Sequence, residues 1–217
     1  MTIGIAIPSC KSYLHHLENL LDNISQQTFK PDQVSVSISD IDHYTPKKDY
    51  GFNLIITTHK ESKKGDENRH IASLKLTTDL VSFFDCDDLM HPSRTEKILK
   101  IFEDKEILAL THGYDVSKNV HKNNIHTLDE FLKINEELVV HKNVIDTVND
   151  KTFFPVSSTM GEISMHNAHV TVRKEVLNIV SSHNNHIYAD SVFNSDLVKN
   201  GIKISFCPNL LSYYNIR

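Results

Sequence analysis

The residues most suited to carry out chemistry form the acidic run Asp85-Cys86-Asp87-Asp88, which comes directly after residues 80–84. In extended backbone, residues i and i+2 face the same side, so Asp85 and Asp87 can point together into one crevice. Carboxylates held close together repel each other unless a cation lies between them. A divalent cation with oxygen ligands, Mg²⁺ or Mn²⁺, is the natural partner, and such an ion also binds phosphates. The alternative is a solvated acidic turn before the helix expected near Ser93.

The elements around this run alternate between strand and helix patterns, which favours an α/β domain with a mainly parallel sheet. Such sheets bind ligands at the carboxyl ends of their strands, where the acidic run lies. Residues 93–96, with Ser93 and Glu96, have the form of a capping box. The expected strands are 2–7, 34–40, 52–57, 80–84, 107–110, 169–172 and 202–206. The expected helices are 13–24, 65–77, 93–102, 128–134, 174–180 and 190–199, whereas residues 153–165 show no clear period.

The composition predicts one soluble globular domain, with 39% apolar and 24% charged residues in a chain of 217. A net charge of −5 argues against a nucleic-acid binder with a broad basic face. Three widely separated cysteines imply no disulfide framework and suit a reducing compartment. The N-terminal residues lack the features of a signal peptide, and no window approaches 18 consecutive apolar residues. We therefore expect a soluble, cytoplasmic protein, of microbial or viral origin, with no transmembrane segment.

Several short motifs follow one another along the chain. Residues 5–9 end in a turn similar to "IPxYN", and residues 25–28 are similar to "SIxxQT". Residues 31–40 form a strand ending in Asp40, residues 68–72 stand in the place of "ARNxGI", and residues 84–88 match "LDxDD". Further similarity returns at residues 169–174, 188–201 and 210–214. Together and in this order, the motifs resemble those of GT-A-fold glycosyltransferases of the family 2 type.

The resemblance implies a Rossmann-like, three-layer α/β/α domain over residues 1–217. Its first half, about 1–110, would bind a nucleoside-diphosphate sugar and a metal, and its second half, about 111–217, would bind the acceptor. The implied reaction is inverting transfer of a sugar, from a UDP-sugar by family analogy, to a hydroxyl of a glycan or glycoprotein. The chain can also be one domain of a longer, multidomain protein.

The resemblance also assigns residues to the nucleotide. Pro8 and Ser9, at the end of the first strand, would line its pocket, and Asp40 would contact the base or ribose. Arg69 would approach the diphosphate, for which the fork of a guanidinium is suited. The alternative for Arg69 is an ordinary residue on a helix surface. The family's turn here reads Pro8-Ser9-Cys10-Lys11, without the usual Tyr and Asn. Asp40 is followed by Ile41-Asp42 rather than by a serine, which leaves the ribose contacts open.

For the metal and the chemistry, the resemblance implies that Asp85 and Asp87 bracket the ribose and Mn²⁺ or Mg²⁺, with Asp87 favoured as the direct ligand. Cys86 lies between them in the same cofactor-binding segment and is expected to face the core. Asp88 would turn away or help from the loop. The family's acidic pair before a late helix reads Ala189-Asp190, so Asp190 is the candidate base. Its alternative role is the N-cap of that helix.

His166 and His169 flank the returning motif and are candidates for the acceptor or metal side, with structural histidines as the alternative. Two other functions remain open. One is a non-catalytic module of the same fold that holds a nucleotide-sugar or glycan. The other is a Mg²⁺-dependent phosphohydrolase, although such enzymes place their DxD motif after the first strand, and here it begins at residue 85.

Overall fold

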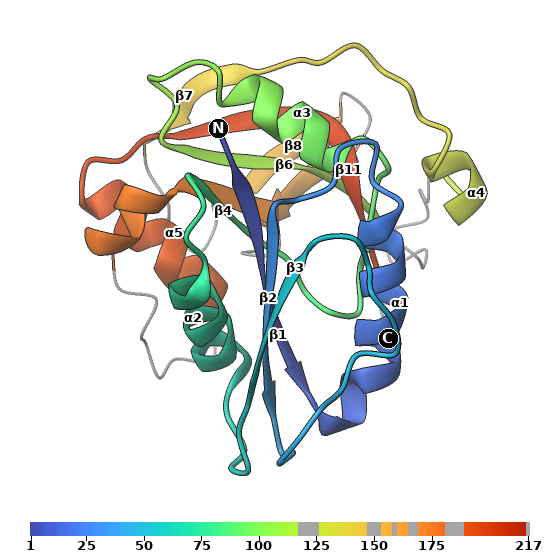
Figure 1. The fold of residues 1–217 in the computed structure, drawn as a ribbon. Coiled ribbons are helices and arrows are strands. Elements are labelled where there is room, and N and C mark those ends of the chain that lie inside the picture. The colour runs from blue at the N-terminus through green and yellow to red at the C-terminus, as the bar shows by residue number, and fades with distance from the viewer. Residues whose placement is uncertain (117–125, 147–152, 158–159, 165–168, 181–188, 216–217) are drawn as a thin grey trace.

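A nine-stranded sheet forms the centre of the computed structural model, which describes residues 1–116, 126–146, 153–157, 160–164, 169–180 and 189–215 (Figure 1). The strand order is β3-β2-β1-β4-β10-β6-β11-β5, with β7 also pairing with β11. The sheet consists of β1 (Ile3–Cys10), β2 (Gln33–Ser39), β3 (Asn53–Thr58), β4 (Leu80–Phe83), β5 (Leu89–Met90), β6 (Ala109–Val116), β7 (His141–Ile145), β10 (Val170–Arg173) and β11 (Ile204–Tyr214). A separate antiparallel pair contains β8 (Phe153–Ser157) and β9 (Met160–Ser164).

Most strands of the sheet run in one direction. The strands β3, β2, β1 and β4 are mutually parallel, and β6 pairs with β11 in parallel. The exceptions are β10, which lies antiparallel between β4 and β6, and the edge strands β5 and β7. The mainly parallel α/β sheet predicted from the sequence is therefore confirmed.

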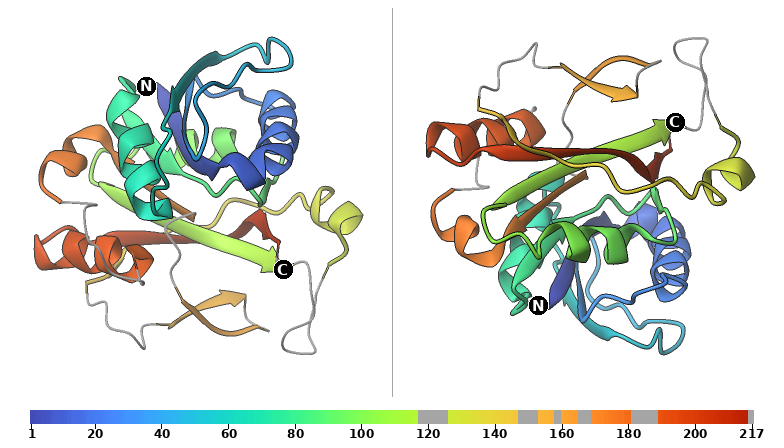
Figure 2. Two further views of the ribbon diagram at one scale, coloured as in Figure 1. Left: turned by 90° about the horizontal axis from the view of Figure 1, so that it is seen from below. Right: turned by 90° about the horizontal axis from the view of Figure 1, so that it is seen from above.

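Helices cover both faces of the sheet, which gives three layers (Figure 2). On one face, α1 (Leu14–Ser25) and α3 (Arg94–Ile101) bury their apolar sides against alternate residues of the strands. On the other face lie α2 (Gly65–Lys75), α5 (Ala189–Lys199) and the 3₁₀ helix η3 (Lys174–Asn178). The remaining helices are the 3₁₀ turn η1 (Lys11–Tyr13) and the short α4 (Leu128–Phe131).

Strand β1 shows why both layers pack closely at the centre. Ile5 and Ile7 face α1, whereas Ala6 faces the α2 side, as the alternation of a strand requires. Gly4 also faces α2, and a Cβ at this position would lie 2.6 Å from Thr78 Oγ1 and 2.7 Å from a Leu76 methyl group. The absence of a side chain at Gly4 thus lets the end of α2 approach the sheet.

The predicted capping box at the start of α3 is wrong. The helix does begin after Ser93, but the Ser93 side chain makes no capping hydrogen bond. Its hydroxyl lies 2.9 Å from His91 Nδ1. Glu96 accepts a hydrogen bond from the Thr28 hydroxyl instead of reaching back to Ser93. The backbone N–H of Thr95 instead donates to the side chain of Gln27, at 3.1 Å, from the segment that follows α1.

Other boundaries differ from the expected ones. Residues 174–178 form the 3₁₀ helix η3 rather than an α-helix, and α4 ends at Phe131. A capping box that the sequence analysis missed joins Thr127 and Glu130 at the start of α4. The strand expected at 202–206 and the motif segment 210–214 belong to one strand, β11, whose pairing with β6 shifts register on either side of Leu210.

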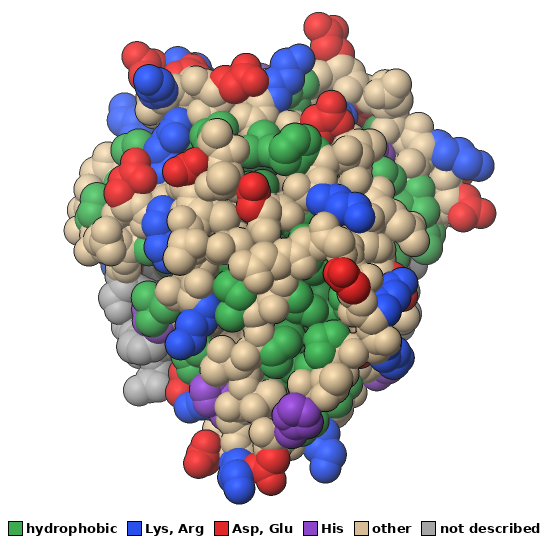
Figure 3. Space-filling view, in the orientation of Figure 1, with side chains coloured by type: hydrophobic (Ala, Val, Ile, Leu, Met, Phe, Trp, Pro, Cys, Tyr) green, Lys and Arg blue, Asp and Glu red, His purple; other side chains and the backbone are tan. Residues whose placement is uncertain are grey.

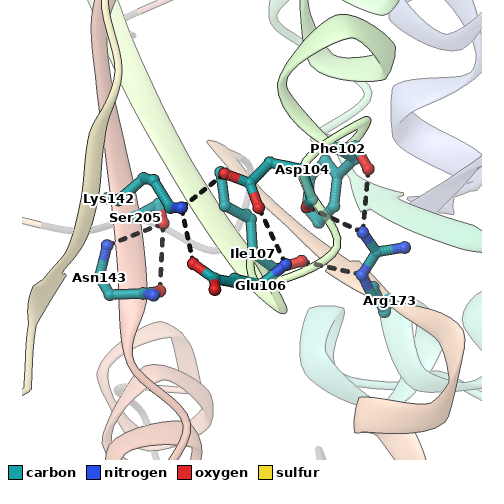
Figure 4. Close-up of polar contacts among 8 residues, drawn as sticks. All are labelled: Phe102, Asp104, Glu106, Ile107, Lys142, Asn143, Arg173 and Ser205. Carbon is teal, nitrogen blue, oxygen red and sulfur yellow. Dashed lines mark hydrogen bonds and ion pairs between the residues drawn. The ribbon is translucent and has the colours of Figure 1, made fainter.

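Arg173 ties β10 to the connection between α3 and β6, at the end of the sheet where β1 begins (Figure 4). Its guanidinium donates to three backbone carbonyls, those of Phe102, Asp104 and Ile107. Lys142 of β7 reaches the same connection and pairs with Asp104 at 2.6 Å and Glu106 at 2.7 Å. Arg173 and the Lys142 pairs therefore stabilise the scaffold far along the strands from the acidic run.

Lysine and arginine side chains are interspersed with aspartate and glutamate on the face shown in Figure 3, without one large basic area. Of the helices that the structure describes, none has the length and apolar character needed to cross a membrane.

Candidate functional site

A cleft of about 390 Å³ opens at the carboxyl ends of β1 and β4, on the side of the sheet covered by the start of α2. Because β1 and β4 are adjacent parallel strands, the residues that follow them meet at one edge. The lining residues are Pro8, Ser9, Cys10, Tyr13, Lys63, Gly65, Asn68, Arg69, Asp85, Cys86 and Asp87. The structure thus brings together six of the residues that the sequence assigned to nucleotide and metal.

Asn68 fixes the position of α2 over the cleft. Its buried amide donates to the carbonyl of Ser9 at 3.0 Å and accepts from the Ser37 hydroxyl at 2.9 Å. One side chain therefore joins α2 to the ends of β1 and β2. The sequence analysis quoted Asn68 within a motif but gave it no role, since neither partner is near in the chain.

Arg69 and Asp85 form an ion pair in the wall of the cleft. Arg69 Nη2 donates to Asp85 Oδ1 at 2.6 Å, and the Arg69 side chain is almost fully buried. Arg69 is therefore not an ordinary surface residue of the helix. The pair has no net charge and fixes the orientation of the Asp85 carboxylate.

Cys86 is buried among the core residues beneath the cleft, as expected. Burial raises the pKa of its thiol far above neutrality, and the neighbouring Asp87 carboxylate raises it further. The thiol therefore stays protonated and is a poor nucleophile. Asp88 is buried as well and does not line the cleft; its Oδ1 accepts the backbone N–H of Asn215 at 2.9 Å. Asp88 thus links the acidic run to the end of β11.

The remaining predicted residues lie elsewhere. Asp40 follows β2 with a positive φ of 61° and is exposed, and it is not among the residues that line the cleft. His169 is buried, with Nδ1 3.0 Å from the Ser212 hydroxyl and its ring stacked on Tyr114. Asp190 is the second residue of α5, which begins at Ala189, and its side chain is not described. His166 lies outside the described residues.

The sequence analysis did not predict several of the residues that line the cleft. Tyr13 was predicted as the first residue of a helix, but it ends the 3₁₀ turn η1 and lines the cleft. Lys63 lies in the lysine-containing connection between β3 and α2, where periodicity carries no information. Gly65 opens α2, and a Cβ built there would meet no atom within 4 Å, so the cleft is open on this side.

The chemistry of the acidic run fits a cation that arrives with its ligand. Within the described parts of the chain, no three His, Cys, Asp or Glu side chains gather closely enough to enclose a metal ion. Asp85 and Asp87 nevertheless offer carboxylate oxygens at the cleft, the donor type that Mg²⁺ and Mn²⁺ take. Mg²⁺ commonly binds one or two carboxylates together with water and substrate phosphates. Two carboxylates at an open cleft suit such a site.

Comparison with solved structures establishes the fold. The chain is similar to S. aureus TarS 1–349 in complex with UDP, with a TM-score of 0.62 and 13% identity over 100% of this chain and 61% of that one. The same fragment with UDP-GlcNAc gives 0.62 and 15%, over 100% and 59%. The mannosyltransferase PcManGT from Pyrobaculum calidifontis, with GDP-Man and Mn²⁺, gives 0.61 and 14%, over 97% and 56%.

These similarities confirm the predicted GT-A-like architecture. The chain spans about three fifths of the length of these solved chains. No family model and no curated protein matches the sequence.

Proposed function

We propose that the protein is a metal-dependent, inverting glycosyltransferase of the hexosyltransferase type. It would transfer a sugar from a nucleoside-diphosphate sugar, with UDP favoured, to a hydroxyl group of a glycan or glycoprotein. The observation that carries this proposal is the convergence of the β1 end, Arg69 and the Asp85–Asp87 carboxylates on one cleft. In addition, the similar solved proteins hold UDP, UDP-GlcNAc, or GDP-Man with Mn²⁺.

The lining of the cleft suits the parts of such a donor. Tyr13 offers an aromatic face to a base, and the backbone at Pro8 and Ser9 offers polar groups to a nucleoside. Arg69 lies where it can meet a diphosphate and at the same time hold Asp85. We assign Asp87, and secondarily Asp85, as the ligands of Mn²⁺ or Mg²⁺.

The proposed reaction needs no further reagent. The acceptor oxygen attacks the anomeric carbon from the face opposite the leaving group, and Asp190 takes the proton of the acceptor hydroxyl. The bond from the anomeric carbon to the diphosphate oxygen breaks, and its electron pair remains on that oxygen. A bound divalent cation would hold both phosphates and stabilise the charge that develops on the departing nucleoside diphosphate.

Calorimetric titration with UDP and GDP, with and without Mn²⁺, tests the donor site. We expect Mn²⁺-dependent binding of one nucleotide by the wild type, and loss of that binding in Asp87→Ala. The matched control is Asp42→Ala, because Asp42 is an exposed aspartate in the β2–β3 connection that pairs only with exposed Lys60 among the described residues. Failure of the wild type to bind either nucleotide with Mn²⁺ or Mg²⁺ would refute the donor site.

Turnover separates an enzyme from a binding module. Release of nucleoside diphosphate from the matching sugar nucleotide should be abolished in Asp190→Asn, while this variant still binds the nucleotide. Binding without turnover by the wild type, across a set of UDP- and GDP-sugars and glycan acceptors, would favour the non-catalytic module.

A further inference from the structure

The charges that line the cleft are balanced before any ligand enters. Of the described residues in its wall, four are charged at neutral pH: Lys63, Arg69, Asp85 and Asp87. Arg69 is committed to Asp85 at 2.6 Å, within the cleft wall. Lys63 forms its ion pair outside the cleft wall: its Nζ lies 2.6 Å from Glu67 Oε1, and Glu67 does not line the cleft.

The Lys63–Glu67 pair is easily exchanged. The Lys63 side chain is 20% exposed, but that of Glu67 is 42% exposed, so water reaches the carboxylate and competes with Lys63 for it. The Lys63 ammonium ends a flexible four-carbon stem, so it can change partner without movement of the backbone. Arg69 differs, since its side chain is only 10% exposed and its partner Asp85 lies in the cleft wall itself.

We propose that Lys63 is a diphosphate-binding residue of the donor site, and that it pairs with Glu67 until a nucleotide enters and takes its place. This inference rests on the proposed function. A nucleoside-diphosphate sugar brings two negative charges, which a divalent cation balances. After the sugar leaves, the nucleoside diphosphate carries one more negative charge than before. Lys63 is the cation of the cleft wall that can leave its partner and meet this charge, which would stabilise the departing group.

The test compares ligands that differ only in their phosphates. Binding of UDP and of uridine, with Mn²⁺, is measured for the wild type and for Lys63→Met; GDP and guanosine replace them if GDP is the nucleotide bound. We expect Lys63→Met to weaken diphosphate binding about tenfold and to leave nucleoside binding unchanged. Lys60→Met is the matched control, because Lys60 lies in the same connection with a side chain that is 77% exposed and outside the cleft wall.

A second variant tests the role of Glu67. Glu67→Gln removes the competing carboxylate, and we expect diphosphate binding about two- to fivefold tighter than in the wild type. Unchanged UDP binding in Lys63→Met, or an equal loss for UDP and uridine, would overturn the inference and leave the proposed function standing. Weaker UDP binding in Glu67→Gln would overturn this role of Glu67. Absence of nucleotide binding by the wild type would overturn both the proposed function and this inference.

Discussion

Replacement of Gln27 should lower the free energy of unfolding markedly, because this one side chain makes three hydrogen bonds to the segment around α3. Gln27 lies two residues after the end of α1, in the segment similar to "SIxxQT", and it is buried. The Gln27 amide donates to the carbonyl of His91 at 2.8 Å. Its carbonyl oxygen accepts from both the backbone N–H and the hydroxyl of Thr95, each at 3.1 Å. Gln27 therefore supplies the cap that Ser93 does not give to α3.

Gln27→Ala removes these three hydrogen bonds inside the protein, because Thr95 is fully buried and His91 is 5% exposed. The His91 carbonyl keeps the Arg94 N–H as a donor, whereas Thr95 loses both of its bonds to Gln27. At about 1 kcal/mol for each bond, the free energy of unfolding should fall by about 3 kcal/mol. For a chain of this length that corresponds to a decrease in Tm of about 6–12 °C. Gln27→Leu fills most of the volume without the hydrogen bonds, so a similar loss there would assign the effect to the bonds rather than to a cavity.

Urea unfolding followed by circular dichroism measures this loss, with Gln26→Ala as the matched control. Gln26 is adjacent and exposed, and only its backbone takes part in the described hydrogen bonds, so its replacement should change stability by less than about 0.5 kcal/mol. Equal stability of Gln27→Ala and Gln26→Ala would refute the reasoning. Because only β5 separates residues 91–95 from the acidic run, nucleotide binding by Gln27→Ala should also weaken at temperatures where the variant is folded.

Two further predictions concern stability. Burial lowers the pKa of His91 to about 4, and Ser93 donates its backbone N–H to His91 Nδ1 at 3.2 Å, which requires an unprotonated nitrogen. The unfolded chain binds this proton near pH 6.5. As the pH is lowered from about 6.5 to 4, the free energy of unfolding should therefore fall by about 1.4 kcal/mol per pH unit. His91→Asn, which keeps an acceptor for Ser93, should reduce that slope in urea titrations at several pH values; an unchanged slope would contradict the assignment. Gly4→Ala should cost about 1–3 kcal/mol in the same assay, because its Cβ would lie 2.6 Å from Thr78 Oγ1, whereas Gly65→Ala has open space and should be nearly neutral.

The donor half of the fold was predictable because its signals are local. Strand alternation in β1 and β2, the apolar stripe of α1 and the placement of the acidic run after β4 each depend on a few consecutive residues. Adjacent parallel strands then bring their carboxyl ends together, so the meeting of Ser9 with Asp87 at one cleft follows from topology. No partner far along the chain had to be known.

The features that could not be predicted depend on distant partners. The cap of α3 comes from Gln27, 68 residues before Thr95, and a local rule had assigned it to Ser93. The antiparallel insertion of β10 between β4 and β6 joins residues about 90 positions apart, as the bond from Thr171 to Ser82 shows. Lys63 lines the cleft but lies in the connection between β3 and α2, where no periodic pattern indicates which side chains face a site.

The Arg69–Asp85 pair also bears on the order in which metal and nucleotide bind. Asp85 is already engaged by Arg69, and the acidic run offers the cleft at most two carboxylates, which hold a hydrated divalent ion weakly when it arrives alone. A nucleotide diphosphate adds phosphate oxygens as ligands and gives Arg69 and Lys63 an anion to meet. We therefore expect Mn²⁺ alone to bind weakly and Mn²⁺ with UDP to bind cooperatively, because each ligand completes the site of the other. Calorimetric titration of Mn²⁺ in the presence and absence of UDP measures this coupling. Equal Mn²⁺ affinity in the two titrations would show that the acidic run forms a complete metal site by itself.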